Sequence, residues 1–502
     1  MKNMMRYFCL AVLVLAVATM AGCTKDEIGD TVTFTTTVEM PGGTKALDGN
    51  GHKTFAVGDQ IKVTYDDGKE AISNELTAAD INRSGKSARF TFTLSSPRLT
   101  KDSPIKYEYP AAHKDLSGQD GTLATLAAKY DYAKWEGTVA TEGQLPNNAS
   151  LINQYAILKI LLTDGFYENH NDRYRQLIVK INNKIVAVNR TPSADTIFVA
   201  VEPVASGNIV FEAAYGKNLY KNRNTLSGKT LEAGHLYPIK VVMNEVKGTL
   251  SGPFLVDPSG TIVHFSKGNL QAYFNTSGAT PKWQIAKNQY TFVGDNNPNT
   301  QVNGTGSADA NNAVDLFGWS TDANIYYGID SNTNNSRYNG TFVDWGNITV
   351  INYDGADTKD EYIRDDWFTL DSLQWRYLIS HHTYGEAIVH GTQGFVILPD
   401  YWKLPDGCSF TDFAHGGYTS NNYTNDQWEL MEAAGAVFLP AAGKRNGRDV
   451  NEAGTHGYYW SSSAPATSTT SAYCFFFYNN NMGNNIWPGT ERHFGYSVRL
   501  VR

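Results

Sequence analysis

The chain of 502 residues is poor in charge, in cysteine and in long apolar runs. Charged residues make up only 18% of it, and 42 Lys and Arg stand against 50 Asp and Glu, so there is no basic footprint for nucleic acid. Beyond Thr19, no apolar run approaches the ~20 residues of a membrane-spanning helix. Only Cys408 and Cys474 follow residue 23, and their separation leaves open whether they are bonded or are two buried thiols.

The chain also lacks the residue clusters on which catalysis and metal binding depend. His381 and His382 are adjacent at the end of a predicted helix, so their side chains point in different directions and zinc is not expected there. His456 and His493 have no cluster of Cys, Asp or Glu at ligand spacing beside them. We therefore predict no catalytic residue, no metal, no cofactor and no enzymatic activity.

What the chain does contain is typical of β-rich extracellular modules: 12% aromatic residues and 45 Gly. In the first half, apolar and polar residues alternate with period two, and no well-capped helical segment interrupts them, which favours a pair of β-sandwiches. Nine of the ten Trp lie beyond residue 247, and Gly and Pro in the segment 247–253 are expected to end the preceding strand there. The alternating residues are Val32, Phe34, Val38, Met40, Ile61, Val63, Tyr65, Phe90, Phe92, Leu94, Tyr237, Ile239 and Val241.

The N-terminal segment has the pattern of a cleaved leader. A basic start is followed by the apolar run Tyr7–Thr19, which is too short to span a bilayer, and by Met20-Ala21-Gly22-Cys23. This ending resembles the lipobox of bacterial lipoproteins, although an ordinary secretory peptide is the alternative. The resemblance implies a signal peptide over 1–22, lipidation of Cys23, a linker over 23–30, and anchoring at the outer membrane or cell surface.

Three short motifs in the first half resemble the fimbrillin family of Bacteroidetes: Thr44–Ala46, Phe55–Val63 and Leu231–Val241. The resemblance covers about residues 30 to 245. It implies two transthyretin-like β-sandwich subdomains, at 31–145 and 146–246.

Fimbrillins are lipoprotein precursors of surface pili, and the resemblance implies assembly with other pilin subunits by donor-strand addition. The removable strand would be Thr31 to Met40, with proteolytic processing near Lys45, where the family usually has Arg. A groove with unpaired backbone N–H and C=O groups is a strong acceptor for a strand. Because the C-terminus closes another domain, this subunit would accept a strand without donating one, as a pilus tip or accessory subunit does.

The second half is predicted to be an α+β domain over 252–502. It contains helices over 371–380 and from Thr424, whose spacing to Gln427 fits a capping box, and strands over 436–440, 473–478 and 496–501. It resembles the C-type lectin-like fold, in its formylglycine-generating-enzyme branch. The residues that carry this resemblance are Val263–Leu270, Asp315–Trp319, Trp345-Gly346, Ile397–Asp400, Val437–Gly443, Tyr459–Ser462 and Ser497–Val501.

The residues of this chain support neither formylglycine-generating activity nor calcium-dependent sugar binding. The two cysteines do not match the active-site placement of formylglycine-generating enzymes. In Leu398-Pro399-Asp400, Leu replaces the first calcium ligand of sugar-binding lectins. We expect Trp319, Trp375, Trp428 and Trp460 to be core residues.

The frames 457–463 and 495–502 enclose a segment crowded with aromatic and amide side chains, the composition of a recognition surface. By strand alternation we assign Phe475 and Phe477 to the core and turn Tyr473 and its successors outward. The predicted ligand-binding residues are Tyr458, Tyr473, Phe476, Tyr478, Asn480, Met482, Asn484, Trp487, Thr490 and His493.

These frames also resemble the variable proteins of diversity-generating retroelements, in which Asn codons mark randomised positions. The sequence thus predicts a cell-surface adhesin, a fimbrillin-like pilus tip or accessory subunit, that presents a lectin-like domain to an unknown protein or glycan. Two alternatives stay open: a glycan-binding lipoprotein of a polysaccharide-uptake system, and a divergent enzyme of the formylglycine-generating branch.

Overall fold

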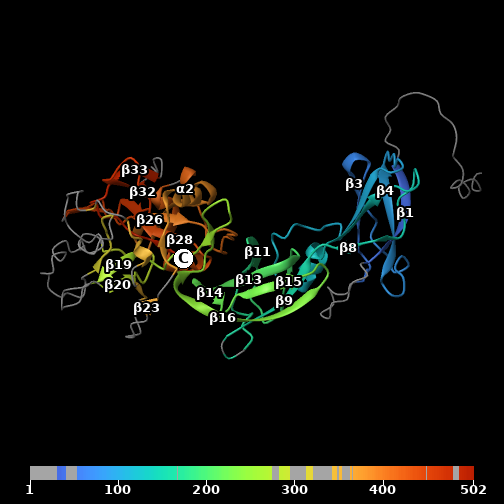
Figure 1. The fold of residues 1–502 in the computed structure, drawn as a ribbon, viewed down its shortest axis with the longest axis horizontal. Coiled ribbons are helices and arrows are strands. Elements are labelled where there is room, and N and C mark those ends of the chain that lie inside the picture. Colours follow the sequence, from blue (N-terminus) through green and yellow to red (C-terminus); the bar gives the residue numbers. More distant parts are fainter. Residues whose placement is uncertain are drawn as a thin grey trace, which may run out of the picture. The chain divides into compact units, whose positions relative to one another are not determined.

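The computed structural model describes residues 31–40, 54–164, 166, 168–273, 282–293, 313–319, 338, 342–347, 350–352, 362–363, 366–415, 417–447, 449–478 and 486–502. These residues form two compact units, each with its own core. The first contains 31–40, 54–111 and 134–151, and the second contains 112–133 and 152–502 (Figure 1). Both are built mainly from β-strands, as the sequence predicts.

The first unit packs two sheets against each other. Apolar side chains of β4 alternate inward, as predicted, and Phe90, Phe92 and Leu94 are fully buried. The ring of Phe92 stacks on Tyr107 of the facing sheet, with centroids 6.2 Å apart. One sheet has the order β4–β1–β7 and the other contains β3–β2–β5–β6. The strands are β1 (Thr31–Glu39), β2 (Lys62–Tyr65), β3 (Lys69–Ile72), β4 (Ser87–Ser95), β5 (Pro104–Tyr109), β6 (Ala133–Thr138) and β7 (Ala149–Ser150), and Asp66–Gly68 forms a 3-10 turn.

The second unit begins with one long sheet that folds back on itself. Its strands run in the order β11–β10–β13–β14–β16–β9–β12, and β15 pairs with β13. Side chains from both ends of this order, such as Val179 and Val199, share one core. In Figure 1, β16 lies beside β9, with which it pairs in parallel. The strands of this sheet are β9 (Ala156–Thr163), β10 (Gln176–Ile181), β11 (Lys184–Asn189), β12 (Ile197–Val201), β13 (Val204–Tyr215), β14 (Asn218–Asn222), β15 (Leu226–Leu231) and β16 (Leu236–Leu250), and the short strand β8 (Ile152–Asn153) precedes them without belonging to this sheet.

A helical turn in this region corrects two expectations. Residues Leu123–Thr125 form α1, capped by the Thr122 hydroxyl, which accepts from the Thr125 backbone N–H at 3.1 Å, and Leu126–Tyr130 continue the coil as a π-helical turn. The first half is thus not free of helix. The side chains of Leu126 and Tyr130 join the core around Phe198, so segment 112–133 lies with the second unit and not within the predicted subdomain 31–145.

The strand expected to end near residue 247 continues through it. β16 runs to Leu250, which pairs with Asn218 of β14. The Leu250 side chain is fully buried in the core of the C-terminal domain, beside Phe254 and Phe265. Gly248 lets the strand continue at this point, because its φ of 76° is a positive value that glycine adopts without steric cost. The chain therefore passes between the two regions without a linker.

In its described residues, the C-terminal domain combines short sheets with two α-helices. The predicted capping box at Thr424 is confirmed, since its hydroxyl accepts from the Gln427 backbone N–H at 3.2 Å while the side-chain Oε1 of Gln427 accepts from the Thr424 backbone N–H at 3.1 Å. Asp371 and Gln374 cap the first helix in the same way. The helices are α2 (Ser372–His381) and α3 (Asn425–Ala433), and 3-10 turns occupy Trp345–Asn347, Phe413–His415 and Tyr418–Asn421.

The sheets of this domain are β17–β18, β21–β19–β20–β22–β23, β24–β34, β27–β25–β26–β28, β29–β30 and β31–β32–β33. Of the predicted strand 496–501, only Leu500–Val501 forms a strand, because the residues before it make single bridges to Phe317 and Tyr459. In the described part of the chain, no helix is long and apolar enough to cross a bilayer. The strands are β17 (Phe254–Leu255), β18 (Ile262–Val263), β19 (Leu270–Tyr273), β20 (Lys282–Ile285), β21 (Ala313–Val314), β22 (Val350–Asn352), β23 (Tyr362–Ile363), β24 (Phe368–Thr369), β25 (Tyr384–Val389), β26 (Thr392–Ile397), β27 (Asn422–Tyr423), β28 (Val437–Pro440), β29 (Lys444–Asn446), β30 (Asp449–Asn451), β31 (His456–Trp460), β32 (Ser471–Tyr478), β33 (Ile486–Glu491) and β34 (Leu500–Val501).

Candidate functional site

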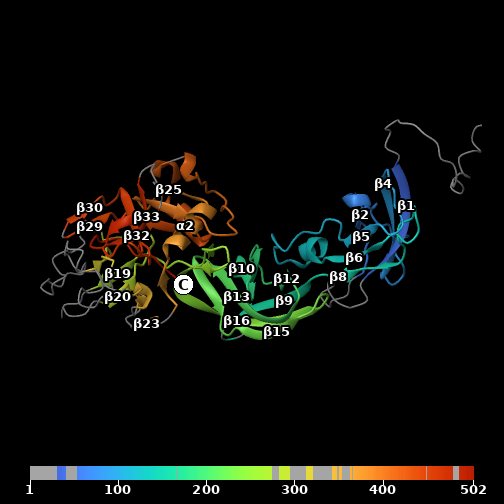
Figure 2. The same ribbon diagram turned by 45° about the horizontal axis from the view of Figure 1, so that its top comes forward.

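The predicted recognition segment forms the antiparallel sheet β31–β32–β33, beside the hairpin β29–β30 (Figure 2). Its register pairs His456 with Tyr478 and Tyr458 with Phe476 on β31 and β32. On the other side of β32, Cys474 is paired with Trp487 of β33. This pairing brings aromatic residues from three strands close to one another.

Strand β32 lies between two cores, so both of its faces are buried. Phe475 and Phe477 pack with Trp375 of α2 and Phe395 of β26, which confirms their predicted place in the core. Tyr473 lies on their side, partly buried against the same core. Its outward assignment was wrong, because positions 473, 475 and 477 of a strand share one face.

The opposite face of the sheet carries a set of stacked rings, which we name the aromatic ladder. His456 stacks on Tyr478 with centroids 4.8 Å apart and planes 14° apart, and Tyr458 stacks on Tyr496 at 4.8 Å and 15°. Trp487 meets the edge of Phe476 at 5.5 Å. Offset and edge contacts of this kind stabilise each ring pair by about 0.5–1.5 kcal/mol. The ladder consists of His456, Tyr458, Phe476, Tyr478, Trp487, Phe494 and Tyr496.

A charged pair lies against one side of the ladder. The Tyr458 hydroxyl donates to Oε2 of Glu452 at 2.7 Å, and Nζ of Lys444 lies 3.1 Å from Glu452 and 5.3 Å from the centre of the Tyr458 ring. Burial alone would raise the pKa of Glu452, but the hydrogen bonds from Tyr458 and Lys444 and the charge of Lys444 lower it. Burial lowers the pKa of His456. At neutral pH the group therefore carries a compensated Lys444–Glu452 pair beside a neutral imidazole.

The predicted contact residues divide by exposure. Trp487 is 53% exposed, and Tyr458, Tyr473 and Tyr478 are half-buried. Three predicted outward residues are instead buried, at 6–7% exposure: Phe476, Thr490 and His493. Each has a packing reason: Phe476 lies among the ladder rings, Thr490 Oγ1 lies 3.4 Å from Cys474 Sγ, and the His493 ring packs on Phe494 at 4.5 Å.

Several predictions fall outside the described residues. Asn480, Met482 and Asn484, and with them the Asn positions of the retroelement hypothesis, belong to residues 479–485, which the structure does not describe. The same holds for the lipidation site Cys23 and the processing site Lys45.

Other ladder residues were missed by the sequence reasoning. Tyr496 belongs to the C-terminal frame 495–502 and Phe494 directly precedes it, and their spacing of two is the signal of a shared face. Lys444 and Glu452 gave no signal, because they reach the ladder from a separate hairpin. The four framework Trp residues are buried as predicted: Trp319, Trp375, Trp428 and Trp460.

The two cysteines are free thiols in this structure. Burial raises the pKa of Cys474 to about 12, and burial also raises the pKa of Cys408. Neither thiol is therefore a reactive thiolate at neutral pH.

No metal site was predicted, yet the described residues bring one possible ligand group together. Ligand atoms of Asp164, Glu168 and His170, in the loop between β9 and β10, lie within 4.8 Å of one another. His170 Nε2 lies 2.8 Å from Asp164, and this hydrogen bond is the main cause that lowers the pKa of the Asp164 carboxyl. The contact satisfies both groups without an ion.

Comparison with known proteins gives one family match and several distant structural ones. Residues 375–501 match a family described as a domain of unknown function (DUF8237). Among curated proteins, nothing matches. A fimbrial protein from Bacteroides ovatus is 10% identical over 94% of this chain and 99% of its own, with a TM-score of 0.23. A fimbrial assembly protein from Parabacteroides distasonis is 12% identical over 48% of this chain and 97% of its own, also at 0.23. Likeness at this level does not establish a shared fold.

Proposed function

We propose that this chain is a cell-surface adhesin, a fimbrillin-like pilus tip or accessory subunit, that binds its partner through the open part of the aromatic ladder. The observation that carries this proposal is the exposure of Trp487, at 53%, on a ring set in which Phe476 contacts Trp487 and also the half-buried Tyr458 and Tyr478. Exposed apolar surface of this kind marks interaction sites when its members are contiguous. A lectin-like ligand-binding role for residues 252–502 is part of the proposal.

The construction of the ladder favours binding. The ring of Tyr478 is held between His456, at 4.8 Å, and Phe476, at 6.2 Å, so it loses little rotamer freedom when a partner binds. Aromatic side chains offer a large contact area at low entropic cost, and they dominate binding energies at interfaces. The Lys444–Glu452 pair supplies polar groups at the edge without net charge.

The polar groups of the ladder favour binding over catalysis. The Glu452 carboxylate is engaged by Tyr458 and Lys444, and its lowered pKa keeps it ionised and weakly basic. Burial raises the pKa of Tyr458 far above its ordinary value, so its hydroxyl stays protonated. A general base needs a pKa near the working pH and a free path to a substrate proton. We therefore propose a non-enzymatic role.

Assembly by donor-strand addition is the second part of the proposal, and the position of β1 supports it. β1 pairs with β4 over nine consecutive residues, from Thr31↔Ser95 to Glu39↔Ser87, and in parallel with β7. Val38 is fully buried. Removal of β1 would leave the backbone groups of β4 unpaired and open a groove over the first core, which a strand of another pilin subunit would fill.

Adhesion is tested by binding of the purified chain to glycan arrays and to cultured cells. Trp487→Ala and Tyr478→Ala should each reduce binding about 30-fold or more, since truncation of an aromatic anchor costs ~2 kcal/mol or more. Tyr215→Ala is the matched control, because Tyr215 is 47% exposed but lies on β13 of the sandwich. Equal binding by all three variants and the unmodified chain would exclude the ladder as the binding surface.

A further inference from the structure

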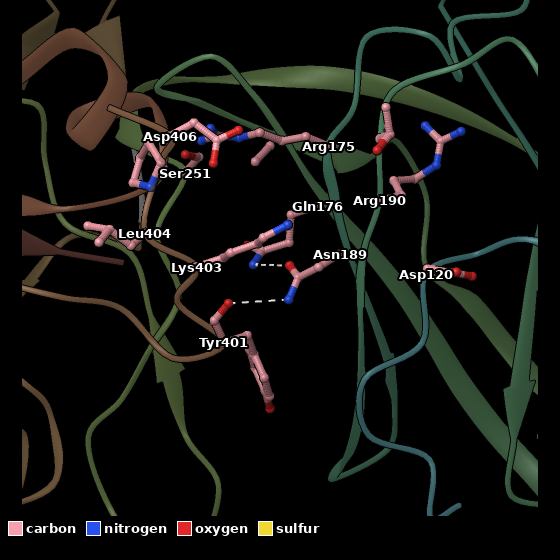
Figure 3. Close-up of a pocket in the computed structure, with 14 residues that line it drawn as sticks. Asp120, Arg175, Gln176, Asn189, Arg190, Ser251, Tyr401, Lys403, Leu404 and Asp406 are labelled. Atoms are coloured by element: carbon pink, nitrogen blue, oxygen red, sulfur yellow. Dashed lines mark hydrogen bonds between the residues drawn. The ribbon is translucent and has the colours of Figure 1, made fainter. Parts of the chain in front are cut away.

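A polar cleft lies within the second unit, away from the ladder residues. It has a volume of about 410 Å³, and none of its lining residues belongs to the aromatic ladder. Figure 3 shows Arg175, Gln176 and Asn189 on one side, from the sandwich, and Tyr401, Lys403 and Asp406 on the other, from the loop after β26. The cleft is large enough for a small ligand.

Arg175 is the unusual member of this lining. It precedes β10, and its backbone is held by hydrogen bonds with Ala214 and Arg190. Within the described residues, its guanidinium has no hydrogen bond and no ion pair within 4.0 Å, although Asp406 lines the same cleft. Burial lowers the pKa of Arg175 to about 10. A cation partly withdrawn from water without an ion pair is costly, so an anion bound at this group would be stabilised.

The neighbouring Arg190 differs from Arg175 in that its guanidinium is hydrogen-bonded. Its guanidinium donates to the backbone carbonyl oxygens of Tyr174 at 2.8 Å and Ser193 at 3.1 Å, and so it fixes the loop before β12. Its donors are used within the fold. No hydrogen bond or ion pair engages the donors of Arg175 within the described residues, and Figure 3 shows its side chain extending from the sandwich toward Asp406.

The rest of the lining specifies what kind of anion fits. Gln176 donates to Asn189 at 2.9 Å, and Asn189 donates to the Tyr401 carbonyl oxygen at 3.3 Å, so the amides form an ordered wall (Figure 3). Amides of this kind hydrogen-bond to hydroxyl groups. Lys403 adds a second cation, whereas Asp120 and Asp406 add negative charge that disfavours a doubly charged phosphate.

We propose that this cleft binds an acidic sugar, with its carboxylate on the Arg175 guanidinium and its hydroxyl groups on the Gln176–Asn189 wall. A guanidinium pairs with a carboxylate through two parallel N–H···O bonds, which gives both strength and orientation. Lys403 strengthens the pair from the opposite side. The cleft shares no residue with the aromatic ladder, so a failure of acidic-sugar binding would not affect the proposed adhesion surface.

Isothermal titration calorimetry of the full chain with glucuronate, glucose and inorganic phosphate tests this proposal. Glucuronate should bind, and glucose and phosphate should bind at least tenfold more weakly. Arg175→Gln should weaken glucuronate binding about tenfold to hundredfold, the loss expected for a hydrogen-bonded charge. Arg173→Gln is the matched control, because Arg173 is exposed and is not part of the lining.

Lys403→Gln keeps the test decisive if Arg175→Gln does not fold, because Lys403 is exposed and its replacement leaves the core intact. It should weaken glucuronate binding about threefold, as expected for a partly screened charge. The proposal is overturned by absence of glucuronate binding, by equal or tighter binding of glucose or phosphate, or by unchanged affinity in folded Arg175→Gln. In the absence of a folded Arg175 variant, unchanged affinity in Lys403→Gln overturns it.

Discussion

Replacing Glu212 by Gln should destabilise the second unit, because this carboxylate joins the sandwich to the C-terminal domain. Glu212 of β13 is 4% exposed, and its Oε2 lies 2.6 Å from Lys180 Nζ and 3.2 Å from His264 Nε2. His264 directly follows β18 of the C-terminal domain. Burial alone would raise the pKa of Glu212, but the hydrogen bonds and charges of His264 and Lys180 outweigh it and hold the pKa well below its ordinary value of 4.5.

The expected loss follows from the burial of the group. Breaking a buried ion pair by removing one charge costs about 3–5 kcal/mol. Lys180 is 21% exposed and can turn toward water, so the lower end, about 3 kcal/mol, applies to Glu212→Gln. Glu245→Gln is the matched control: Glu245 lies 3.8 Å from Lys267 but is 35% exposed, so its loss should be about 0–1 kcal/mol.

The effect should depend on pH with a defined sign. Because the folded pKa of Glu212 is depressed, its stabilisation is present above the unfolded value near 4.5 and is lost as the pH falls below it. Urea unfolding, followed by tryptophan fluorescence at pH 7 and pH 4, measures this. The gap between the unmodified chain and Glu212→Gln should narrow at pH 4. A midpoint equal to that of Glu245→Gln at pH 7, or a gap that widens in acid, would refute the reasoning.

Three further predictions concern the anchor, the domain border and the thiols. Cys23→Ala should release the protein into the soluble fraction or leave it unprocessed, and fatty-acid labelling of the variant would contradict the anchor. A fragment over 247–502 should melt at a higher temperature than one over 252–502, because it keeps Leu250 and the ~1.5–3 kcal/mol of its burial; equal melting temperatures would argue against that contribution. Cys474 should stay unreactive toward a thiol reagent until the protein unfolds, since its pKa of about 12 leaves it protonated, and mass spectrometry of the labelled native protein checks this.

The sequence predicts the features that depend on local patterns. The alternation at Phe90, Phe92 and Leu94 predicts β4 and its buried face, and the spacing of Thr424 and Gln427 predicts the start of α3. Both follow from backbone geometry within a few residues.

The features that depend on distant parts of the chain were not predictable in this way. Strand alternation places Phe475 and Phe477 together, but it cannot show that β32 lies between two cores, which buries Phe476 as well. Lys444 reaches Tyr458 only through the packing of a separate hairpin. The cleft beside Arg175 could not be predicted, because it forms only where the fold places the loop of Lys403 opposite Arg175.

The most direct test of the central claim is hydrogen exchange of the full chain with and without a ligand identified by the array screen. The account predicts slower exchange of backbone amides in β31, β32 and β33, centred on Tyr478 and Trp487, with no such change in Trp487→Ala at the same ligand concentration. Protection confined to other parts of the chain, or unchanged protection in Trp487→Ala, would contradict the claim that the aromatic ladder is the binding surface.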